Sequence, residues 1–407
     1  MTEKLHLSDT YLTRFEAVVV AVREHQGRPG IVLDRTGFHA EGGGQPADRG
    51  TAGEASVEDV LEVGGEVLHL LGPGPVPAPG ARVACAVDWA RRLDHLQQHH
   101  GQHLLSAAFD RIHGAATLSF HLGAATCTID LDAPPARMTA EALTAAEAEA
   151  NRLVWADLPV DARERSPEEA AALPLRKDAV KGLRIVVVGG GESGPVVDAS
   201  PCGGTHPRRT GEVGAVAVLR AQKWGPGTRV EFACGGRVLG LLHQAEDRLA
   251  GASASLRCAP AELVGAVEKL AEEGSARRKE LDRMLGALAA VEAVRLEGTA
   301  VAPEPVVARL DGSLGSPAGL KAVGQALAAR GRTALLGGLE GGRAHLCFAR
   351  ARGPGPHLGE LLRESAALLG GKGGGAPDLA QGSGPDLGGL DEALAAAAAR
   401  AGGGADG

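Results

Sequence analysis

The sequence predicts an α+β protein of more than one domain, and three observations lead to this class. Short β-branched runs separated by Gly, Pro and Asp fill residues 11–87, apolar residues at helical spacing surround a group of histidines near position 100, and alternating strand and helix patterns return after residue 301. A chain of 407 residues is also long for a single core. We expect a small β-barrel over 1–90, an α+β domain over 91–236, a helical hairpin over 237–298 and an α/β domain over 299–407.

The composition limits which cellular compartment and which kinds of binding partner we expect. Six scattered cysteines do not form a disulfide framework, and no N-terminal apolar segment resembles a signal peptide, so we expect the reducing cytoplasm. No run approaches the roughly 20 apolar residues that span a bilayer, so no membrane partner is expected. A net charge of −8 argues against a DNA-coating protein. It leaves room for an RNA partner bound through local basic patches at Arg91-Arg92, Arg208-Arg209 and residues 223–229.

The first part of the chain contains a glycine-rich loop. The runs FEAVVVAV, GIVLD, GEVLHLL and RVACAVD predict the strands of a small antiparallel barrel or sandwich. Between them, TGFHAEGGGQPADRG at 36–50 holds Gly42, Gly43 and Gly44, followed by Gln45. Consecutive glycines let backbone amides approach a ligand closely. The alternative interpretation is a plain hairpin connection.

Two histidines on a predicted helix form half of a candidate metal site. His99 and His103 stand four apart in LDHLQQHHGQHLLSAAF, where leucines at helical spacing indicate a helix, so both imidazoles should project from one face. The pair does not indicate a zincin protease, because H-E-x-x-H requires a glutamate and the residues between the ligands are His100, Gly101 and Gln102. We interpret His95, His100, His113 and His121 as surface or pocket residues before ligands.

The second half of the candidate site lies in CGGTH. Pro201, Gly203 and Gly204 break a helix, but a tight glycine-rich loop can fold the Cys202 thiolate and the His206 imidazole onto one point. Three nitrogens and one sulfur favour tetrahedral zinc over calcium, magnesium or an iron–sulfur cluster.

The segments between these motifs complete the second part. AATLSFHLGAATCTIDLD alternates like a strand pair, and a helix over 140–153 follows Thr139 as its N-cap. A formal G-x-G-x-x-G at Gly189, Gly191 and Gly194 is not a dinucleotide fingerprint, because a strand follows where a helix should begin. We interpret it as a hairpin that delivers Cys202 and His206. GAVAVLRAQKWGPGTRVEFACGG then predicts two closing strands.

The last third begins with helices and ends in a glycine-rich stretch. Residues 238–296 predict a helical hairpin with Ala259-Pro260 at the bend, a surface for homodimer formation. VVARL, TALLGGL and HLCFAR predict strands, and LKAVGQALAAR and HLGELLRESAALL predict helices. GGKGGGAPDLAQGSGPD at 370–386 lacks the G-K-[ST] of a P-loop, so ATP is not expected there. A flexible tail is one interpretation, and a backbone-lined anion or nucleic-acid contact with Lys372 is the one we favour.

These motifs carry a resemblance to a known family. TGFHAEGGGQPADRG, HHGQHLLSAAF, CGGTHPRRTGEVGAV and RVEFACGG, in this order, resemble the editing domain of alanyl-tRNA synthetases and the free-standing alanyl-tRNA editing proteins of the AlaX type. The end of the chain, with GGKGGGAPDLAQG, is similar to the DHH-associated domain of the synthetase C-terminus. The resemblance covers nearly the whole chain and implies the long, free-standing form, without an aminoacylation domain or its ATP site.

The resemblance implies a function and a set of site residues. It implies hydrolysis of the ester between serine or glycine and the terminal ribose of tRNA(Ala). Such esters arise because a pocket for alanine cannot strongly reject either serine or glycine. His99, His103, Cys202 and His206 would be zinc ligands. Gly42, Gly43, Gly44 and Gln45 match the glycine-rich loop, and His39 stands where relatives commonly have tyrosine. Thr117, Ser119 and His121 in TLSFHLG become candidates to hydrogen-bond a serine hydroxyl.

Two mechanisms and one other function stay open at this point. Four protein ligands close the zinc shell, whereas hydrolytic zinc normally keeps a position for water. Either the shell opens to water or substrate, or zinc shapes the pocket while His100 or His121 activates the water. The alternative function is a non-catalytic tRNA-binding scaffold with a structural zinc.

Overall fold

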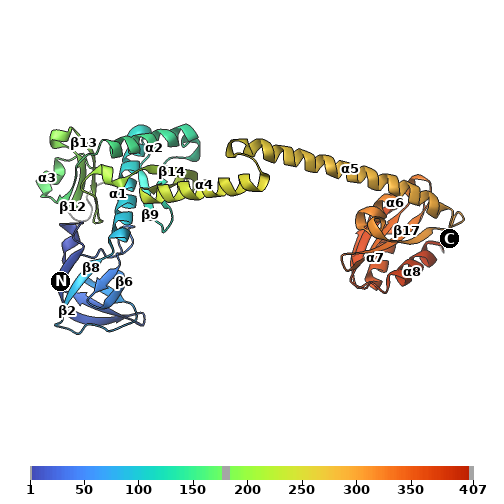
Figure 1. The fold of residues 1–407 in the computed structure, drawn as a ribbon, viewed down its shortest axis with the longest axis horizontal. Coiled ribbons are helices and arrows are strands. Elements are labelled where there is room, and N and C mark those ends of the chain that lie inside the picture. Colours follow the sequence, from blue (N-terminus) through green and yellow to red (C-terminus); the bar gives the residue numbers. More distant parts are fainter. Residues whose placement is uncertain (1, 177–183, 403–407) are drawn as a thin grey trace. The chain divides into compact units, whose positions relative to one another are not determined.

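The computed structural model describes residues 2–176 and 184–402, which fall into two compact units, residues 1–251 and residues 252–407 (Figure 1). Both units mix helices and sheets, as an α+β chain should. The division falls inside the helical segment predicted for residues 237–298. No helix of the described residues is both long and apolar enough to cross a membrane.

Six strands at the start of the first unit pair in a ring that closes on itself. In order around the ring they are β2, β3, β7, β6, β5 and β8, and β8 pairs again with β2. Alternation along each strand points residues such as Ile31, Val60 and Val83 into a shared core around Phe38. The strands span Arg14–His25 (β2), Arg28–Leu33 (β3), Gly50–Ala52 (β5), Ala55–Val63 (β6), Glu66–Leu71 (β7) and Arg82–Val87 (β8), with Glu3–Lys4 (β1) paired to Arg35–Thr36 (β4) beside them.

Helices α1 and α2 contact each other beside a four-stranded sheet, and the three elements share one core. The core joins Leu105 and Phe109 of α1 to Ile129 and Phe232 of the sheet. Helix α2 begins as predicted, since the Thr139 hydroxyl accepts a hydrogen bond from the backbone N–H of Ala142. The elements are Trp89–His113 (α1), Ala140–Trp155 (α2) and, in sheet order, Val216–Trp224 (β14), Gly227–Cys234 (β15), Cys127–Leu131 (β10) and Thr117–Leu122 (β9).

A three-stranded sheet carries the second metal motif. The predicted hairpin is confirmed, because β12 pairs antiparallel with β13 and the glycines of the formal G-x-G-x-x-G lie at its turn. Residues 202–206 follow directly where β13 ends. The elements are Val160–Glu164 (β11), Pro167–Ala171 (α3), Arg184–Gly189 (β12) and Val196–Pro201 (β13).

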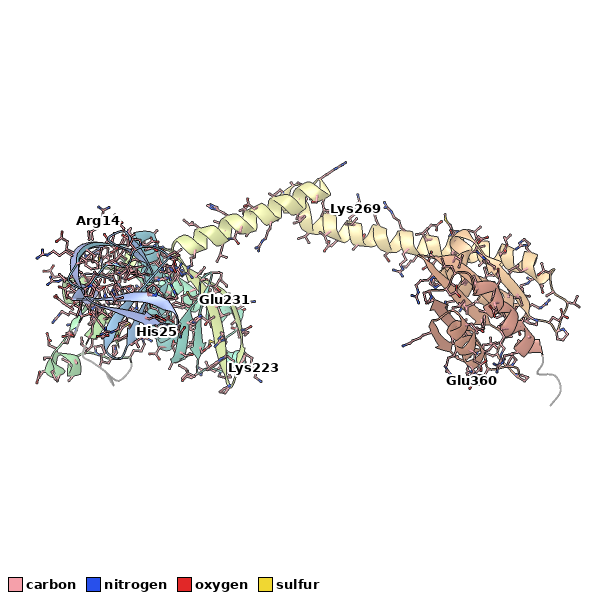
Figure 2. The ribbon with its side chains drawn as sticks, turned by 90° about the horizontal axis from the view of Figure 1, so that it is seen from below. Arg14, His25, Lys223, Glu231, Lys269 and Glu360 are labelled. Carbon is pink, nitrogen blue, oxygen red and sulfur yellow. The ribbon has the colours of Figure 1, made fainter. Side chains whose placement is uncertain are left out.

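Two long helices follow, Gly236–Leu256 (α4) and Leu263–Glu297 (α5). The predicted break is confirmed, since Ala259 is extended and Pro260 starts a single 3₁₀ turn before α5. The pairing of the two helices as a hairpin stays a prediction. Charged side chains such as Lys269 project from α5 (Figure 2).

The second unit is a five-stranded sheet with helices. Its strand order is β16-β17-β18-β20-β19, and the predicted strands and helices between residues 306 and 369 are present. The elements are Val306–Leu310 (β16), Pro317–Ala329 (α6), Ala334–Glu340 (β17), Arg343–Ala349 (β18), Leu358–Leu368 (α7), Lys372–Gly375 (β19), Leu379–Gly384 (β20) and Leu390–Gly402 (α8).

The glycine-rich stretch at 370–386 is not a flexible tail, and its contact with an anion or nucleic acid stays a prediction. It forms β19 and β20, and its glycines let α7 lie close to the sheet. A Cβ atom on Gly373 or Gly382 would come within 2.4 or 2.7 Å of the Leu362 Cδ2 atom. Much of the glycine content therefore serves packing, a demand that composition alone does not reveal.

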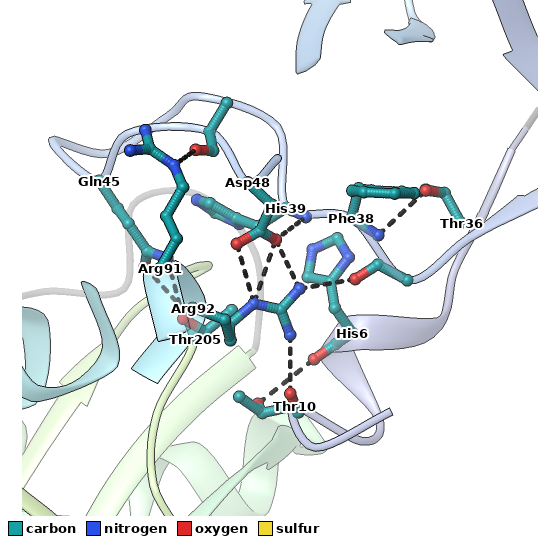
Figure 3. A network of polar contacts seen from close by, with 12 residues as sticks. His6, Thr10, Thr36, Phe38, His39, Gln45, Asp48, Arg91, Arg92 and Thr205 are labelled. Atoms are coloured by element: carbon teal, nitrogen blue, oxygen red, sulfur yellow. Dashed lines mark hydrogen bonds and ion pairs between the residues drawn. The ribbon is translucent and has the colours of Figure 1, made fainter. Parts of the chain in front are cut away.

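A buried ion pair joins α1 to the glycine-rich loop of the first unit (Figure 3). The Arg92 guanidinium lies 2.5 Å from the Asp48 carboxylate, and both side chains are fully buried. Arg92 also donates to the backbone oxygens of Thr10 and Gly37, each at 2.7 Å. One side chain thus connects the N-terminal segment, the loop and the helix that carries His99 and His103.

Removing one partner of this pair should destabilise the first unit. Asp48→Ala leaves a buried guanidinium without its counter-charge, which costs about 3–5 kcal/mol. The three tryptophans, Trp89, Trp155 and Trp224, all lie in the first unit, so tryptophan fluorescence during urea unfolding reports on this unit alone. Glu66→Ala removes the partner of Arg23 in an exposed pair and should leave the curve nearly unchanged. Equal midpoints for the two variants would contradict this role of Arg92 and Asp48.

Candidate metal centre

The two predicted metal motifs meet in the first unit. His99, His103, Cys202 and His206 each offer a ligand atom, and these atoms all lie within 4.8 Å of one another. The Cys202 Sγ atom is 3.3 Å from Nε2 of His99 and 3.3 Å from Nε2 of His206. Cys202 is partly buried and the three histidines are buried. The cluster can therefore hold a metal ion.

Two glycines allow this close approach. Gly101 lies inside α1, where a Cβ atom would come within 2.2 Å of the Cys234 Sγ atom, so the helix packs on β15 only with glycine there. A Cβ atom on Gly204 would come within 2.1 Å of Cε1 of His99. Alanine at Gly204 would push the loop of the second motif away from His99, and alanine at Gly101 would push α1 away from β15.

The loop after β13 is held in place by hydrogen bonds to its backbone atoms. Arg184 donates to the carbonyl oxygen of Cys202 at 2.7 Å and to that of Gly204 at 3.0 Å. The Gly204 N–H points to the Cys202 sulfur at 3.5 Å. Arg184 thus fixes the loop that presents Cys202 and His206.

The ring of His99 is oriented by Gln45. Its Nδ1 lies 2.7 Å from the Gln45 Oε1 atom, a carbonyl oxygen, so Nδ1 donates and Nε2 keeps its lone pair toward the cluster. The same oxygen accepts from the backbone N–H of Thr205, and the Gln45 amide donates to the Thr205 hydroxyl at 2.8 Å. Gln45 therefore ties the glycine-rich loop to both metal motifs. Figure 3 shows its contact with Thr205.

The other two histidines also have partners behind them. Nδ1 of His206 is hydrogen-bonded to Nδ1 of His100 at 3.0 Å. Nδ1 of His103 lies 3.6 Å from the Asp198 carboxylate, which is too long for a hydrogen bond, so this contact is electrostatic. Asp198 is in turn paired with Arg176 at 2.8 Å.

The charge states of Cys202 and His206 suit metal binding, whereas His103 would have to lose a proton to a bound metal. Burial alone would raise the pKa of the Cys202 thiol, but His99 and His206 outweigh it and hold that pKa well below its ordinary value, which favours the thiolate. Burial lowers the pKa of His206 to about 3, so its imidazole is neutral with a free lone pair. Burial also opposes charge on His103, but Asp198 and Cys202 outweigh it and raise that pKa.

A cavity of about 670 Å³ opens beside the cluster. His103, Cys202 and Gly204 form one part of its wall, and Phe120 and Phe38 add aromatic surface. The size lies in the range of pockets for drug-sized ligands, roughly 300–1,000 Å³, and exceeds what one small amino acid requires.

The predicted loop residues take different positions around this cavity. Gly42 and Gly43 line it. Gly44, at φ +81°, packs against the Phe120 ring, where a side chain would clash. Gln45 is fully buried and holds His99, so its contact with substrate stays a prediction.

The predicted pocket strand presents another residue. In β9, Phe120 lines the cavity, whereas Thr117, Ser119 and His121 are not among its lining residues. Side chains alternate along a strand, so residues one position away from Phe120 point elsewhere. Ser119 donates to Asp130 instead, and Thr117 donates to Ser106. Their role as substrate contacts stays a prediction.

Two further predicted residues lie away from the cavity. His100 is fully buried behind His206 and does not line the cavity. Lys372 is exposed at the start of β19 in the second unit. The tertiary structure adds residues that the sequence analysis did not single out, notably His6, Asp198 and Arg184. Of these three residues, only Arg184 could have been noticed from the sequence, because it is a charged residue at the start of an apolar run.

Comparison with known proteins gives matches over most of the chain. The family model described as the threonyl and alanyl tRNA synthetase second additional domain matches residues 183–230, and the DHHA1 domain model matches residues 319–403. The alanyl-tRNA editing protein AlaX-L of Pyrococcus horikoshii is 33% identical, over 93% of this chain and 94% of that protein.

Two other relatives match over a smaller share of their own length. The alanine–tRNA ligase of Methanothrix thermoacetophila is 33% identical over 93% of this chain and 42% of the ligase. The alanyl-tRNA editing protein Aarsd1 of Rattus norvegicus is 35% identical over 59% of this chain and 57% of that protein.

Loss of the Gln45 amide should weaken metal binding without removing a ligand. Gln45→Ala leaves Nδ1 of His99 without its acceptor, and such changes behind a ligand typically cost about 10–100-fold in metal affinity. Competition with a chelator of known affinity measures the change. Gln222→Ala, at an exposed position on β14, is the matched control. Equal affinities of the two variants would show that Gln45 does not orient His99.

Proposed function

Because this chain belongs to the family of alanyl-tRNA editing proteins, we propose that it hydrolyses the ester between serine or glycine and the terminal ribose of tRNA(Ala). The cluster of His99, His103, Cys202 and His206, of which His103 and Cys202 line a large cavity, carries the proposal. An alanine pocket cannot strongly reject smaller glycine, or serine, which adds only a hydroxyl. A separate site that removes the wrong amino acid meets that need.

Zinc is the metal that the donor set fits best. Three imidazole nitrogens and one thiolate within 4.8 Å suit tetrahedral zinc, and each histidine has a partner behind it, as zinc ligands usually do. When bound, zinc would supply a Lewis acid or a rigid wall beside the ester.

The surrounding side chains would set the geometry of the reaction. Gln45 and Arg184 hold the ligand loops in place, and Phe120 covers the His99 ring at a centroid distance of 5.7 Å. Neither His100 nor His121 lines the cavity, so a water that either one activates would lie outside it. This placement argues against a base supplied by these two histidines. It favours the alternative, in which zinc held by the four residues of the cluster would itself supply the Lewis acid.

The site of action would be the cytoplasm. All six cysteines are free thiols, which supports a reducing compartment. Lys372 is proposed as a phosphate contact of the second unit, although a single exposed lysine adds only a small share of tRNA affinity.

Deacylation of mischarged tRNA tests the proposed function. Zinc-loaded protein should release serine from Ser-tRNA(Ala) faster than alanine from Ala-tRNA(Ala). Cys202→Ala should lower both zinc content by elemental analysis and the rate, the latter by roughly two orders of magnitude, because a Lewis acid contributes several kcal/mol. Cys258→Ala, in the segment between α4 and α5, should keep both.

The wild-type result decides between the two candidate functions. Release of serine no faster than in buffer, with zinc loaded, would leave a tRNA-binding scaffold with a structural zinc. Normal zinc content in Cys202→Ala would show that this thiolate is not a ligand.

We also propose that α5 joins two copies of the chain. Four apolar residues of α5 follow a 3-4-3 spacing and are 52–72% exposed, namely Leu281, Met284, Leu288 and Val291. Ala289 and Ala293, on another face of the same helix, are buried against the rest of the second unit. This spacing places the four apolar side chains in one stripe, as at the a and d positions of a coiled coil.

Charge on this stripe should break the dimer. The double variant Leu281→Glu, Leu288→Glu should sediment as a monomer at concentrations where the wild type is dimeric, because like charges would face each other across the seam. Ala290→Glu adds the same charge at an exposed position of α5 outside the stripe and should remain dimeric. A monomeric wild-type protein would remove the proposed dimer and leave the proposed hydrolysis untouched.

A further inference from the structure

Most polar side chains on the cavity wall already have partners within the protein. Lys4 pairs with Glu62 at 2.8 Å, Arg176 with Asp198 at 2.8 Å, and the Gln102 amide donates to Ser106 at 2.7 Å. These contacts satisfy the groups that would otherwise bind a ligand. The polar atoms without a partner are therefore the informative ones.

Four side chains on this wall have such atoms, and besides Arg184 and the cluster residue His103 they are two histidines, His6 and His39. His6 and His39 are 4% and 5% exposed and both line the cavity. Nδ1 of His6 and Nε2 of His39 are buried, and no hydrogen bond to either atom occurs within the described residues. The two rings meet edge to face, with centroids 5.4 Å apart and planes at 88°. Burial of an unpaired polar atom is costly, so these positions indicate a ligand.

Hydrogen bonds hold the backbone of both histidines in place (Figure 3). The His39 N–H donates to the Asp48 carboxylate at 2.5 Å, and the Asp48 N–H donates to the His39 carbonyl at 3.0 Å. The His6 carbonyl accepts from the Thr10 hydroxyl, and the Thr10 carbonyl accepts from Arg92. The Arg92–Asp48 ion pair thus preorganises both histidines, as a recognition site requires.

Both rings are neutral near pH 7. Burial lowers the pKa of His39 to about 4, and burial followed by the nearby His39 lowers the pKa of His6 well below its ordinary value. A neutral imidazole has one donor and one acceptor nitrogen. Two neutral rings side by side can therefore serve a group that both donates and accepts.

We propose that His6 and His39 bind the side-chain hydroxyl of the seryl group and so determine the preference for serine over alanine at the site of the proposed function. A hydroxyl can donate to one ring and accept from the other. An alanyl or glycyl group would enter the same cavity and leave both nitrogens unpaired, so of the two esters of the proposed function this pair selects the seryl ester. Sites built to hydrogen-bond a substrate hydroxyl reject the analogue without it by large factors, up to about 10⁴–10⁵.

The position of the pair supports this assignment over the strand predicted from the sequence. His6 and His39 share the cavity with Cys202 and His103, whereas Thr117, Ser119 and His121 do not line it. The Ser119 and Thr117 hydroxyls also already donate to Asp130 and Ser106.

Paired substrate analogues and histidine variants test the inference. The probes are the non-hydrolysable seryl and alanyl amides of 3′-amino-3′-deoxyadenosine, whose dissociation constants are measured by calorimetry with the zinc-loaded full chain. Wild type should prefer the seryl amide, and His39→Phe and His6→Phe should each reduce the preference about tenfold or more. His39→Gln and His6→Asn replace the unpaired ring nitrogen with an amide and should restore part of it.

Controls separate recognition from folding and from the proposed hydrolysis. His25→Phe changes a histidine of β2 outside the cavity (Figure 2) and should keep the wild-type preference. Zinc content and tryptophan fluorescence report folding of each variant, and the amide variants decide the question if a phenylalanine variant does not fold. An unchanged preference in folded His39 and His6 variants, or no seryl preference in wild type, would overturn the inference. Failure of wild type to deacylate any tRNA would instead overturn the proposed function, since analogue binding is measured without turnover.

Discussion

The buried ion pair between Arg92 and Asp48 is the constraint on which the site depends. A fully buried charge pair is stable only with good geometry and further hydrogen bonds, and here the carbonyls of Thr10 and Gly37 provide them. The pair fixes the glycine-rich loop against the first turn of α1. Everything that the loop presents, from His39 to Gln45, takes its position from this contact.

The metal cluster is assembled from two segments whose positions relative to each other are not set by either segment alone. Helix α1 alone sets the spacing of His99 and His103, but the loop after β13 reaches them only because Gly204 leaves room and Arg184 holds the loop carbonyls. Gln45 then joins all three segments through His99 and Thr205. Metal affinity at this cluster should therefore depend on how the first unit packs, because the ligands come from two distant stretches of sequence.

The sequence predicted most elements because each has a local cause. The i,i+4 histidines, the Thr139 cap and the break at Pro260 depend on neighbours within a few residues, and the structure contains all three. The strand β9 shows where such reasoning ends. Its alternation was visible, but which side faces the cavity depends on its pairing with β10 and on the Phe120 contact with His99, so the pocket residues could not be chosen from the pattern.

By itself, the sequence determined the α+β class, the order of the elements and the four side chains of the metal cluster. Helix periodicity, turn chemistry and ligand type each depend on residues that are close together in the sequence. Only the tertiary structure decided what surrounds that cluster. It turned Gln45 toward His99, placed His100 behind His206 and brought His6 beside His39 on the cavity wall. These are contacts between segments that lie 33 to 106 residues apart, and a long-range contact is set by how whole elements pack, which no local pattern encodes.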